Sequence, residues 1–337
     1  MPPMNKTTRI GVLMGGLSAE RDISMISGET VLRALQEQGY DAVGLTVGRD
    51  VARVVERARV DVVFNALHGR WGEDGCVQGV LEVLGIPYTG SGVLASALAM
   101  NKLKAKEIFR LHNLPTPPYY SLSAAQLDHL DEIHGSFGFP VIVKPTGEGS
   151  SLGVSRADDL DQLRVACQEA LDLDDHVLIE RHIEGKEVCV GVVNGRALGA
   201  IGVVSHNGIF DYEAKYSVGH ASFHLPARLS PTRYRGVLTQ ALRAHQALGC
   251  AGATRIDMIV SDLGNEYILE LNTLPGLTPR SLLPRLAKHA HISYGDLIVE
   301  ILDDAKIRGA GACERRPTSL PTTAPVSRPS RRVVAAS

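Results

Sequence analysis

The stretch TRIDMIVSDLGNEYILELNTLPGLTP, residues 254–279, decides the fold. Residues 254–260 and 266–271 are rich in Ile, Val, Leu and Tyr, and Asp-Leu-Gly-Asn separates them. Such a pattern predicts two antiparallel strands joined by a tight turn, which we place at Leu263-Gly264. An Asn-Thr-x-Pro-Gly segment follows the second strand directly. The stretch is therefore interpreted as a β-hairpin that ends in a loop.

The two strands carry polar side chains at matching positions. Because side chains alternate faces along a strand, this turn places Asp257 opposite Glu270 and Arg255 opposite Asn272. All four then lie on one face, and a register slip of one residue would destroy the arrangement. The apolar side chains point to the other face, namely those of Ile256, Met258, Val260, Leu269 and Leu271.

The polar face has the chemistry of a cation site. Two carboxylates and an amide oxygen suit Mg²⁺ or Mn²⁺, and Glu270, between Asp257 and Asn272, could bridge two ions. The alternative is a solvated face of an edge hairpin, where Asp, Glu and Asn are common. The apolar opposite face and the adjacent Pro-Gly loop favour the cation site, since backbone amides beside a cation suit a phosphate or an oxyanion.

Composition bounds the class of protein. A chain of 337 residues, 44% hydrophobic and 21% charged, predicts a globular protein of roughly two or three domains. The net charge of −2 gives no reason to expect binding to nucleic acid or to a membrane surface. The five cysteines have no metal-binding spacing, which is typical of reduced thiols in the cytoplasm. We expect no signal peptide and no membrane-spanning segment.

The N-terminal region has the order strand, glycine turn, helix. The apolar run 9–14 ends in Gly15-Gly16, and a helical pattern continues to about residue 38, as in nucleotide-binding α/β domains. Glu20, taken alone, would be an acid in the first turn of a helix. His68 follows an apolar strand pattern and opens the glycine-rich segment HGRWGEDG, which indicates either a ligand loop or a histidine satisfied within a turn.

The middle of the chain contains candidate phosphate-binding elements. The run 139–145 predicts a strand that carries Lys144, whose ammonium group would need an anionic partner if buried. TGEGSSLG, residues 146–153, is a loop that could hold phosphates or be a flexible surface turn. It is not a Walker A loop, because the GK[ST] ending is missing. An apolar strand pattern then ends in Glu180, which could also be a surface acid.

The last third predicts an antiparallel sheet from 188–193, 197–204 and the hairpin. Residues 210–229 show no clear period, which indicates a long functional loop. An amphipathic helix is expected over 231–248, and further helices after Arg280 and over 297–307. Ser281, near a helix start, would be a cap or an anion ligand.

Several motifs in order resemble those of ATP-grasp ligases, and in detail those of the D-alanine–D-alanine ligase family. They are GGLSAERDISMISG, HGRWGEDG, EGSSLG, the E-x-x-I-x-G-x-E pattern of 180–187, and RID-x(12)-ELNTLPGLTPRSL. The resemblance covers residues 8–307. It implies an α/β ATP-grasp fold with four parts: an N-terminal Rossmann-like parallel-sheet domain (1–101), a central domain (102–187), a C-terminal antiparallel-sheet domain (188–308) and a disordered basic tail (309–337).

The resemblance also implies the roles of individual residues. Substrate and catalytic roles fall on Glu20 and His68 for the first D-alanine, Ser281 and Leu282 for the second, Arg255 and the Gly276 amide for the oxyanion, and Ser150 and Tyr216 for closure of the loop. Nucleotide contacts fall on Lys102, Lys144 and Lys215 for phosphates, on Glu180, His182 and Ile183 for adenine, and on Glu187 for ribose. Asp257 and Glu270 would hold one Mg²⁺ or Mn²⁺, and Glu270 and Asn272 a second.

The implied activity is ATP-dependent ligation of two D-alanines through a D-alanyl phosphate, which supplies cell-wall peptidoglycan precursors. The implied enzyme is a cytoplasmic homodimer. Three rivals stay open. One is a ligase that makes D-alanyl-D-lactate or uses D-serine, against which Tyr216 argues for the lactate case. The others are an ATP-grasp ligase with another amino-acid substrate and a nucleotide-binding regulatory protein without turnover.

Overall fold

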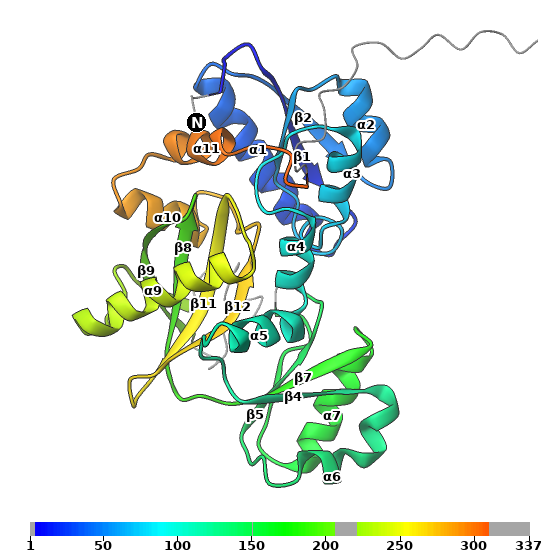
Figure 1. The fold of residues 1–337 in the computed structure, drawn as a ribbon, viewed down its shortest axis with the longest axis vertical. Coiled ribbons are helices and arrows are strands. Elements are labelled where there is room, and N and C mark those ends of the chain that lie inside the picture. Colours follow the sequence, from blue (N-terminus) through cyan, green and yellow to red (C-terminus); the bar gives the residue numbers. More distant parts are fainter. Residues whose placement is uncertain (1–3, 150, 206–220, 310–337) are drawn as a thin grey trace, which may run out of the picture.

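The computed structural model describes residues 4–149, 151–205 and 221–309. Figure 1 shows three α/β lobes, each built on a sheet of its own. One sheet is parallel and two are antiparallel, which confirms the predicted fold class. Ser150, Lys215, Tyr216, most of the expected long loop and the tail lie outside the described residues. None of the helices in the described ranges is long and apolar enough to cross a membrane.

The N-terminal lobe is a three-stranded parallel sheet of order β2-β1-β3. The chain turns at the end of β1 through Gly15 and Gly16, whose φ values of 91° and 88° favour glycine. Residues 86–88 add no strand to this sheet, and Tyr88 contributes a single bridge to Val63. The elements of this lobe are β1 (Arg9–Gly15), α1 (Arg21–Glu37), β2 (Asp41–Val47), α2 (Val51–Ala58), β3 (Val62–Asn65) and α3 (Cys76–Leu84).

The central lobe is a four-stranded antiparallel sheet of order β4-β7-β5-β6, covered by α7. Ile142 on β5 pairs with Glu180 on β7 in the ladder. Lys144, two residues further along β5 on the same face, therefore lies diagonally beside Glu180. The elements are β4 (Tyr119–Ser123), η1 (Ala124–His129), α6 (Leu130–His134), β5 (Val141–Pro145), β6 (Ser155–Ala157), α7 (Leu160–Leu171) and β7 (His176–Arg181).

Two helices connect the N-terminal lobe to the central lobe, α4 (Val93–Met100) and α5 (Lys102–Leu111). Asn101 caps α5, because its side chain accepts a hydrogen bond from the amide of Lys104 at 3.0 Å. The cap fixes the start of α5 and therefore the place of Lys102.

The C-terminal lobe is a five-stranded antiparallel sheet of order β10-β9-β8-β11-β12. Helices α9 and α5 cover one face, where Ile256, Met258 and Val260 are buried as predicted. Helix α10 packs on the other face. Residues 221–224 form the edge strand β10, so the prediction of one structureless loop from 210 to 229 is wrong there. The remaining elements are β8 (Gly185–Val193), β9 (Arg196–Ser205), β10 (Ala221–His224), α9 (Pro231–Ala247), β11 (Ala253–Ser261), β12 (Glu266–Asn272), α10 (Leu282–His289) and α11 (Tyr294–Asp303).

The hairpin β11–β12 has the predicted register: Asp257 pairs with Glu270, and Arg255 pairs with Asn272. The route to this register differs from the expected one. Next to the turn the strands pair one residue away from the predicted register, with Val260 opposite Glu266. A β-bulge at Leu269 then restores the predicted pairing of Asp257 with Glu270. The bulge breaks the alternation, so Leu269 lines the same cavity as Glu270 and does not point away as expected.

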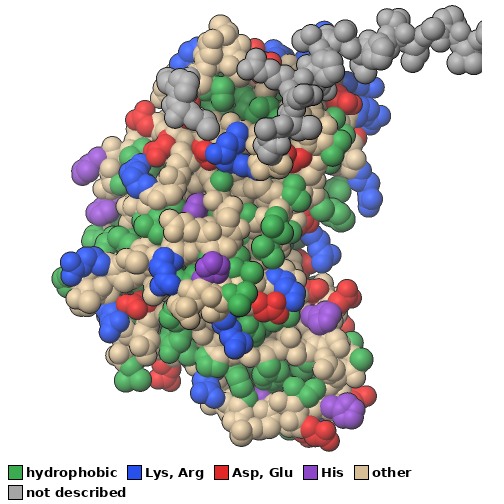
Figure 2. Space-filling model, in the orientation of Figure 1, with side chains coloured by type: hydrophobic (Ala, Val, Ile, Leu, Met, Phe, Trp, Pro, Cys, Tyr) green, Lys and Arg blue, Asp and Glu red, His purple; other side chains and the backbone are tan. Residues whose placement is uncertain are grey.

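The last helix returns to the N-terminal lobe. Helix α11 packs against α1, and Lys306 forms a bridge with Tyr88. One hydrophobic core therefore contains residues of β1 and β3 together with residues of β8, α10 and α11. This shared core fixes the loop after β12 against the carboxyl ends of the N-terminal strands. On the face in Figure 2, acidic and basic side chains are interspersed.

Candidate active site

Two cavities lie along the polar face of the hairpin, and Glu270 lines both of them. The first spans about 630 Å³ of space, part of it open to solvent, and lies between the N-terminal lobe, the start of α5 and the hairpin. The second spans about 770 Å³, also partly open to solvent, and lies between the central and C-terminal sheets. The first contains Glu20, His68, Lys102, Arg255, Glu270, Asn272 and Gly276, and the second contains Lys144, Glu180, His182, Ile183, Glu187, Asp257 and Glu270.

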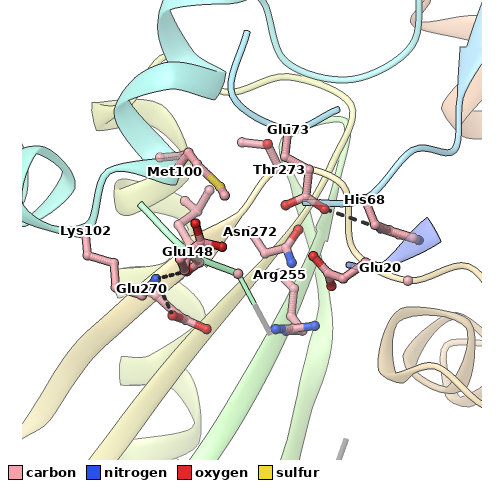
Figure 3. Close-up of a pocket in the computed structure, with 14 residues that line it drawn as sticks. Glu20, His68, Glu73, Met100, Lys102, Glu148, Arg255, Glu270, Asn272 and Thr273 are labelled. Carbon is pink, nitrogen blue, oxygen red and sulfur yellow. Dashed lines mark hydrogen bonds and ion pairs between the residues drawn. The ribbon is translucent and has the colours of Figure 1, made fainter. Parts of the chain in front are cut away.

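Arg255 and Asp257 form a bidentate pair on this face. The Nε and one terminal nitrogen of Arg255 each donate a 2.8 Å hydrogen bond to the Asp257 carboxylate. Burial opposes the charge of Arg255, but the adjacent carboxylate raises the pKa of the guanidinium well above its usual value. Figure 3 shows Arg255, Asn272 and Glu20 pointing into the first cavity. A permanently charged, fixed donor therefore stands at its wall.

Lys102 connects the hairpin to the glycine- and serine-rich loop. Its ammonium group donates a 2.5 Å hydrogen bond to the carbonyl of Glu148 and lies 3.8 Å from a carboxylate oxygen of Glu270. Figure 3 shows both contacts. Arg70, which belongs to the N-terminal lobe, has its Nε 3.6 Å from a carboxylate oxygen of Glu148. The loop that was predicted to hold phosphates is therefore held by Lys102 and by the N-terminal lobe, and Lys102 in turn approaches Glu270 on the hairpin.

The donor set on the hairpin fits a hard divalent cation that a substrate phosphate helps to hold. Among the residues in the described ranges, no group of three His, Cys, Asp or Glu side chains forms a ready-made metal site. Mg²⁺ typically takes only one or two carboxylates and completes its shell with phosphate oxygens and water. Asp257, Glu270 and the amide of Asn272 supply such a partial set, with Asn272 Oδ1 oriented by a 2.9 Å bond from the Leu274 amide.

The end of the first cavity in the N-terminal lobe is a buried polar cluster. His68 lies between Ser27, whose hydroxyl is 3.1 Å from Nε2, and Glu73, whose carboxylate is 3.3 Å from Nδ1. Burial raises the pKa of Glu73 above its usual value. Gly69 and Gly149 leave room for Glu20, since an added Cβ at either would crowd its carboxylate. Glu20 therefore has a defined place between these loops.

The loop after β12 brings Gly276 and Ser281 together. A Cβ on Gly276 would lie 2.8 Å from Ser281 Oγ, so only glycine allows this approach. Ser281 precedes α10 without capping it through its side chain, and its hydroxyl lies 2.8 Å from that of Thr278. The side chain of Leu282 is buried in the core shared with the N-terminal lobe, which leaves its backbone as the part that could contact a ligand.

The second cavity holds a carboxylate between two ammonium groups. Glu180 Oε2 accepts a 2.8 Å bond from Lys144, and Lys106 Nζ lies 2.6 Å from Oε1. The amide of His182 donates to the carbonyl of Pro140 at 3.0 Å, so a planar ligand beside residues 182–183 would pair with other backbone groups. Burial lowers the pKa of the His182 imidazole. The second cavity therefore combines the carboxylate of Glu180, the backbone at residues 182–183 and the ammonium group of Lys144.

Comparison with known proteins agrees with this geometry. A family model described as the D-alanine–D-alanine ligase C-terminus matches residues 108–303, and the model of the N-terminus matches residues 47–91. A D-alanine–D-alanine ligase from Geobacter sulfurreducens is 51% identical over 310 residues, which cover 91% of this chain and 98% of the relative. The chain belongs to the D-alanine–D-alanine ligase family.

Solved structures of the family share the fold. A D-alanine–D-alanine ligase from Bacillus anthracis aligns with a TM-score of 0.79 at 37% identity over 88% of this chain and 97% of that one. The same enzyme complexed with ATP gives a TM-score of 0.77 at 36% identity, over 89% and 97% of the two chains. A D-Ala:D-Ser ligase from Enterococcus faecalis gives 0.78 at 26% identity, over 88% and 98%. The predicted family and its ligase class are thereby confirmed.

Most of the expected site residues converge on the two cavities, but the family motifs did not single out every contributor. Ser150, Lys215 and Tyr216 lie outside the described residues, so their roles stay predictions. The motifs did not indicate that Lys106 contacts Glu180 or that Glu73 lines the first cavity. Lys106 lies four residues after Lys102 on α5, a helical spacing that places both on one side of the helix, and this spacing was the signal available in the sequence.

Proposed function

We propose that the protein uses ATP to join two D-alanine molecules into D-alanyl-D-alanine, a precursor for peptidoglycan. The observation that carries the proposal is the position of Glu270. It lines both cavities and pairs across the hairpin with Asp257, beside the Arg255–Asn272 pair. A phosphoryl donor in the second cavity and an acceptor in the first would meet at this residue.

The nucleotide is assigned to the second cavity. Glu180 has acceptor oxygens for the amino group of adenine, the backbone at His182 and Ile183 borders the cavity, and Glu187 is placed for ribose hydroxyls. Lys102 supplies positive charge 3.8 Å from Glu270, and Lys144 supplies positive charge in the second cavity, which Glu270 also lines. We infer that these lysines bind the phosphates, and that Ser150 and Lys215 add contacts on closure.

Asp257, Glu270 and Asn272 would hold two Mg²⁺ or Mn²⁺ ions, with Glu270 between them. When bound, these ions neutralise charge on the phosphoryl group that is transferred. The chain's own residues do the rest. The fork from Arg255 keeps Asp257 in one orientation, and the amide of Leu274 does the same for Asn272. Lys102 holds the loop that carries Glu148 against the hairpin.

The first cavity would hold the two amino acids. Glu20 would bind the ammonium group of the first D-alanine, whose carboxylate oxygen attacks the γ-phosphorus and releases ADP. The amine of the second D-alanine, bound near Ser281 and the amide of Leu282, then attacks the acyl phosphate carbonyl. Phosphate leaves and the amine gives up a proton. Arg255 and the Gly276 amide stand where they could stabilise the oxyanion, and Tyr216 would hold the loop closed.

A second candidate differs only in the second substrate. The D-Ala:D-Ser ligase of Enterococcus faecalis has the same fold at 26% identity, so the fold itself tolerates a change at that subsite. The relative at 51% identity is named for D-alanine, which favours D-alanine here. From the family resemblance we also propose a cytoplasmic homodimer. The net charge of −2 gives no reason to expect binding to nucleic acid or to a membrane surface.

The test is release of ADP and phosphate from MgATP by the purified protein. D-Alanine, L-alanine, and D-alanine with D-serine or D-lactate are compared near neutral pH, and the product is identified by mass. Release that needs D-alanine and yields the dipeptide supports the proposal. ATP binding without any D-alanine-dependent release would refute it and favour another amino-acid substrate or a regulatory role. Size-exclusion chromatography with light scattering tests the dimer.

A further inference from the structure

Lys106 is the most deeply buried charged side chain beside the second cavity. It arises from α5, and its side chain is 1% exposed. Its ammonium group lies 2.6 Å from Glu180 Oε1, donates a 2.5 Å hydrogen bond to Thr116 Oγ1 and lies 5.8 Å from the centre of the Tyr119 ring. Burying an ammonium group is costly without an anion and further hydrogen-bond partners, and Lys106 has both.

The two lysines on Glu180 are not equivalent. Lys144 lines the second cavity, with a side chain 11% exposed, and contacts Oε2 from the cavity side. Lys106 contacts Oε1 from behind, enclosed by Thr116 and the Tyr119 ring. One carboxylate therefore lies between two amino groups. Burial lowers the pKa of the Lys106 ammonium group, and the adjacent charge of Glu180 opposes that shift. A ligand phosphate at the cavity would attract the lysine that can reach it, and that lysine is Lys144.

We propose that Lys106 is a positioning residue, the fixed counter-ion that keeps Glu180 ionised and in place when Lys144 turns to the nucleotide phosphates. This inference rests on the proposed function, since it takes the second cavity as the nucleotide site. Lys106 itself would touch no substrate. It would act through Glu180, which lines the cavity assigned to the nucleotide.

The pKa of Glu180 supports separate roles for the two lysines. Burial alone would raise the pKa of Glu180, but Lys106, followed by Lys144, more than offsets burial, and the pKa lies below its usual value. Once Lys144 pairs with phosphate, Lys106 is the remaining ammonium group on this carboxylate among the contacts described here. Without Lys106, the same burial would favour a neutral carboxylic acid.

The ionisation state of Glu180 determines which base it selects. A carboxylate only accepts hydrogen bonds, so it favours a purine with an amino group at position 6 and repels the oxygen of a 6-oxo purine. A carboxylic acid can donate as well, and that difference disappears. Lys106 therefore contributes to the preference for ATP over ITP, although it lies behind the acceptor.

The experiment compares Lys106→Met with wild type and with Lys104→Met. Lys104 lies on the same helix but pairs on the surface with Glu107, with a side chain 53% exposed. Affinities for ATP and ITP are measured by calorimetry without D-alanine, and kcat and KM are measured with it. We expect Lys106→Met to lower the ATP:ITP selectivity by about tenfold or more, because a charge-assisted contact to Glu180 is lost. Saturating kcat should change far less, and Lys104→Met should match wild type.

The pH profile separates positioning from a merely structural role. The ATP affinity of Lys106→Met should fall at a higher pH than that of wild type as the solution is acidified, because Glu180 would protonate more easily. Equal weakening for ATP and ITP, with an unshifted profile, would overturn the inference. Wild-type protein that binds no ATP would overturn the proposed function and this inference with it, whereas failure of the inference alone leaves wild-type ATP binding intact.

A second variant covers the case in which Lys106→Met does not fold. Lys106→Met combined with Glu180→Gln removes Lys106 together with the carboxylate that it contacts, so no unpaired carboxylate remains, and Lys144 still lines the cavity. We expect this double variant to fold and to bind ATP and ITP with similar affinity, because an amide can donate as well as accept. Retention of the wild-type selectivity by the double variant would contradict the inference.

Discussion

Arg255 donates two hydrogen bonds of 2.8 Å to the carboxylate of Asp257, its neighbour two positions along β11. A guanidinium has five N–H donors, so this fork leaves others for a ligand in the first cavity, which Arg255 also lines. The pair joins the two parts of the proposed chemistry. Asp257 would face the cations, and Arg255 would face the carbonyl that is attacked.

Replacing Arg255 should affect turnover far more than ATP binding. We expect Arg255→Ala to reduce kcat by about 10²–10³, since one lost oxyanion donor typically adds about 3–4 kcal/mol to the barrier. Arg255→Lys should restore little, because an ammonium group cannot form the fork to Asp257. Steady-state kinetics and calorimetric ATP binding are the measurements. Near-wild-type kcat in Arg255→Ala would show that the oxyanion role is wrong.

Glu270 should determine the metal requirement. Glu270→Gln removes one of the two carboxylates on the hairpin face, so we expect the Mg²⁺ concentration for half-maximal activity to rise by about tenfold or more. Glu266→Gln is the matched control, because Glu266 lies on the same strand and pairs with Arg233 at 3.1 Å outside both cavities. Titration of activity with Mg²⁺ and with Mn²⁺ checks both variants. Equal metal dependence in the two would exclude Glu270 as a ligand.

A side chain at position 276 should displace Ser281 and weaken binding of the second D-alanine. In Gly276→Ala, the new Cβ would lie 2.8 Å from Ser281 Oγ and must displace it. Loss of that contact should raise the KM of the second D-alanine by about tenfold, the effect of one hydrogen bond to a charged group. Gly79→Ala is the control, because a Cβ there meets nothing within 4 Å. KM values at the two D-alanine subsites, obtained from initial rates, should change only at the second subsite and only in Gly276→Ala.

The sequence predicted the hairpin because alternation and turn residues are local signals. Asp257, Glu270, Arg255 and Asn272 pair as expected, and most strands and helices begin within a few residues of their predicted positions. The bulge at Leu269 could not be predicted in this way. A bulge is a compromise between the turn at Ser261–Asn265 and the packing of Ile268 and Leu271, and only the folded sheet sets it.

The buried charges show the same limit. In the sequence, Lys106 belongs to LKAKEIFR, a pattern typical of a helix with solvated lysines. Its burial depends on β7 and Thr116, which come from other parts of the chain. The family resemblance supplied the residues expected to bind the nucleotide and the substrates, because their motifs are contiguous. The supporting contacts of Lys106 and Glu73 come from tertiary packing, which no single motif contains.

His245 should make the fold sensitive to acid. It lies on α9 against β11, with Nδ1 2.8 Å from Thr254 Oγ1, and burial lowers its pKa to about 4 despite the charge of Asp304. In the unfolded chain the imidazole has its ordinary pKa near 6.5, so between that pH and about 4 the unfolded state binds the proton and the folded state does not. Stability therefore falls as the pH drops through this window.

The size of this effect can be measured directly. The shift corresponds to a loss of about 2 kcal/mol by pH 5 and of roughly 3 kcal/mol below pH 4. His245→Gln cannot titrate, so its urea-unfolding free energy, followed by circular dichroism, should lose about 2 kcal/mol less between pH 7 and pH 5 than that of wild type. His289→Gln, which changes an exposed histidine at the end of α10, should keep the wild-type pH dependence. If His245→Gln kept it too, acid sensitivity would have to arise from other groups, such as the carboxylate of Glu180 beside Lys106.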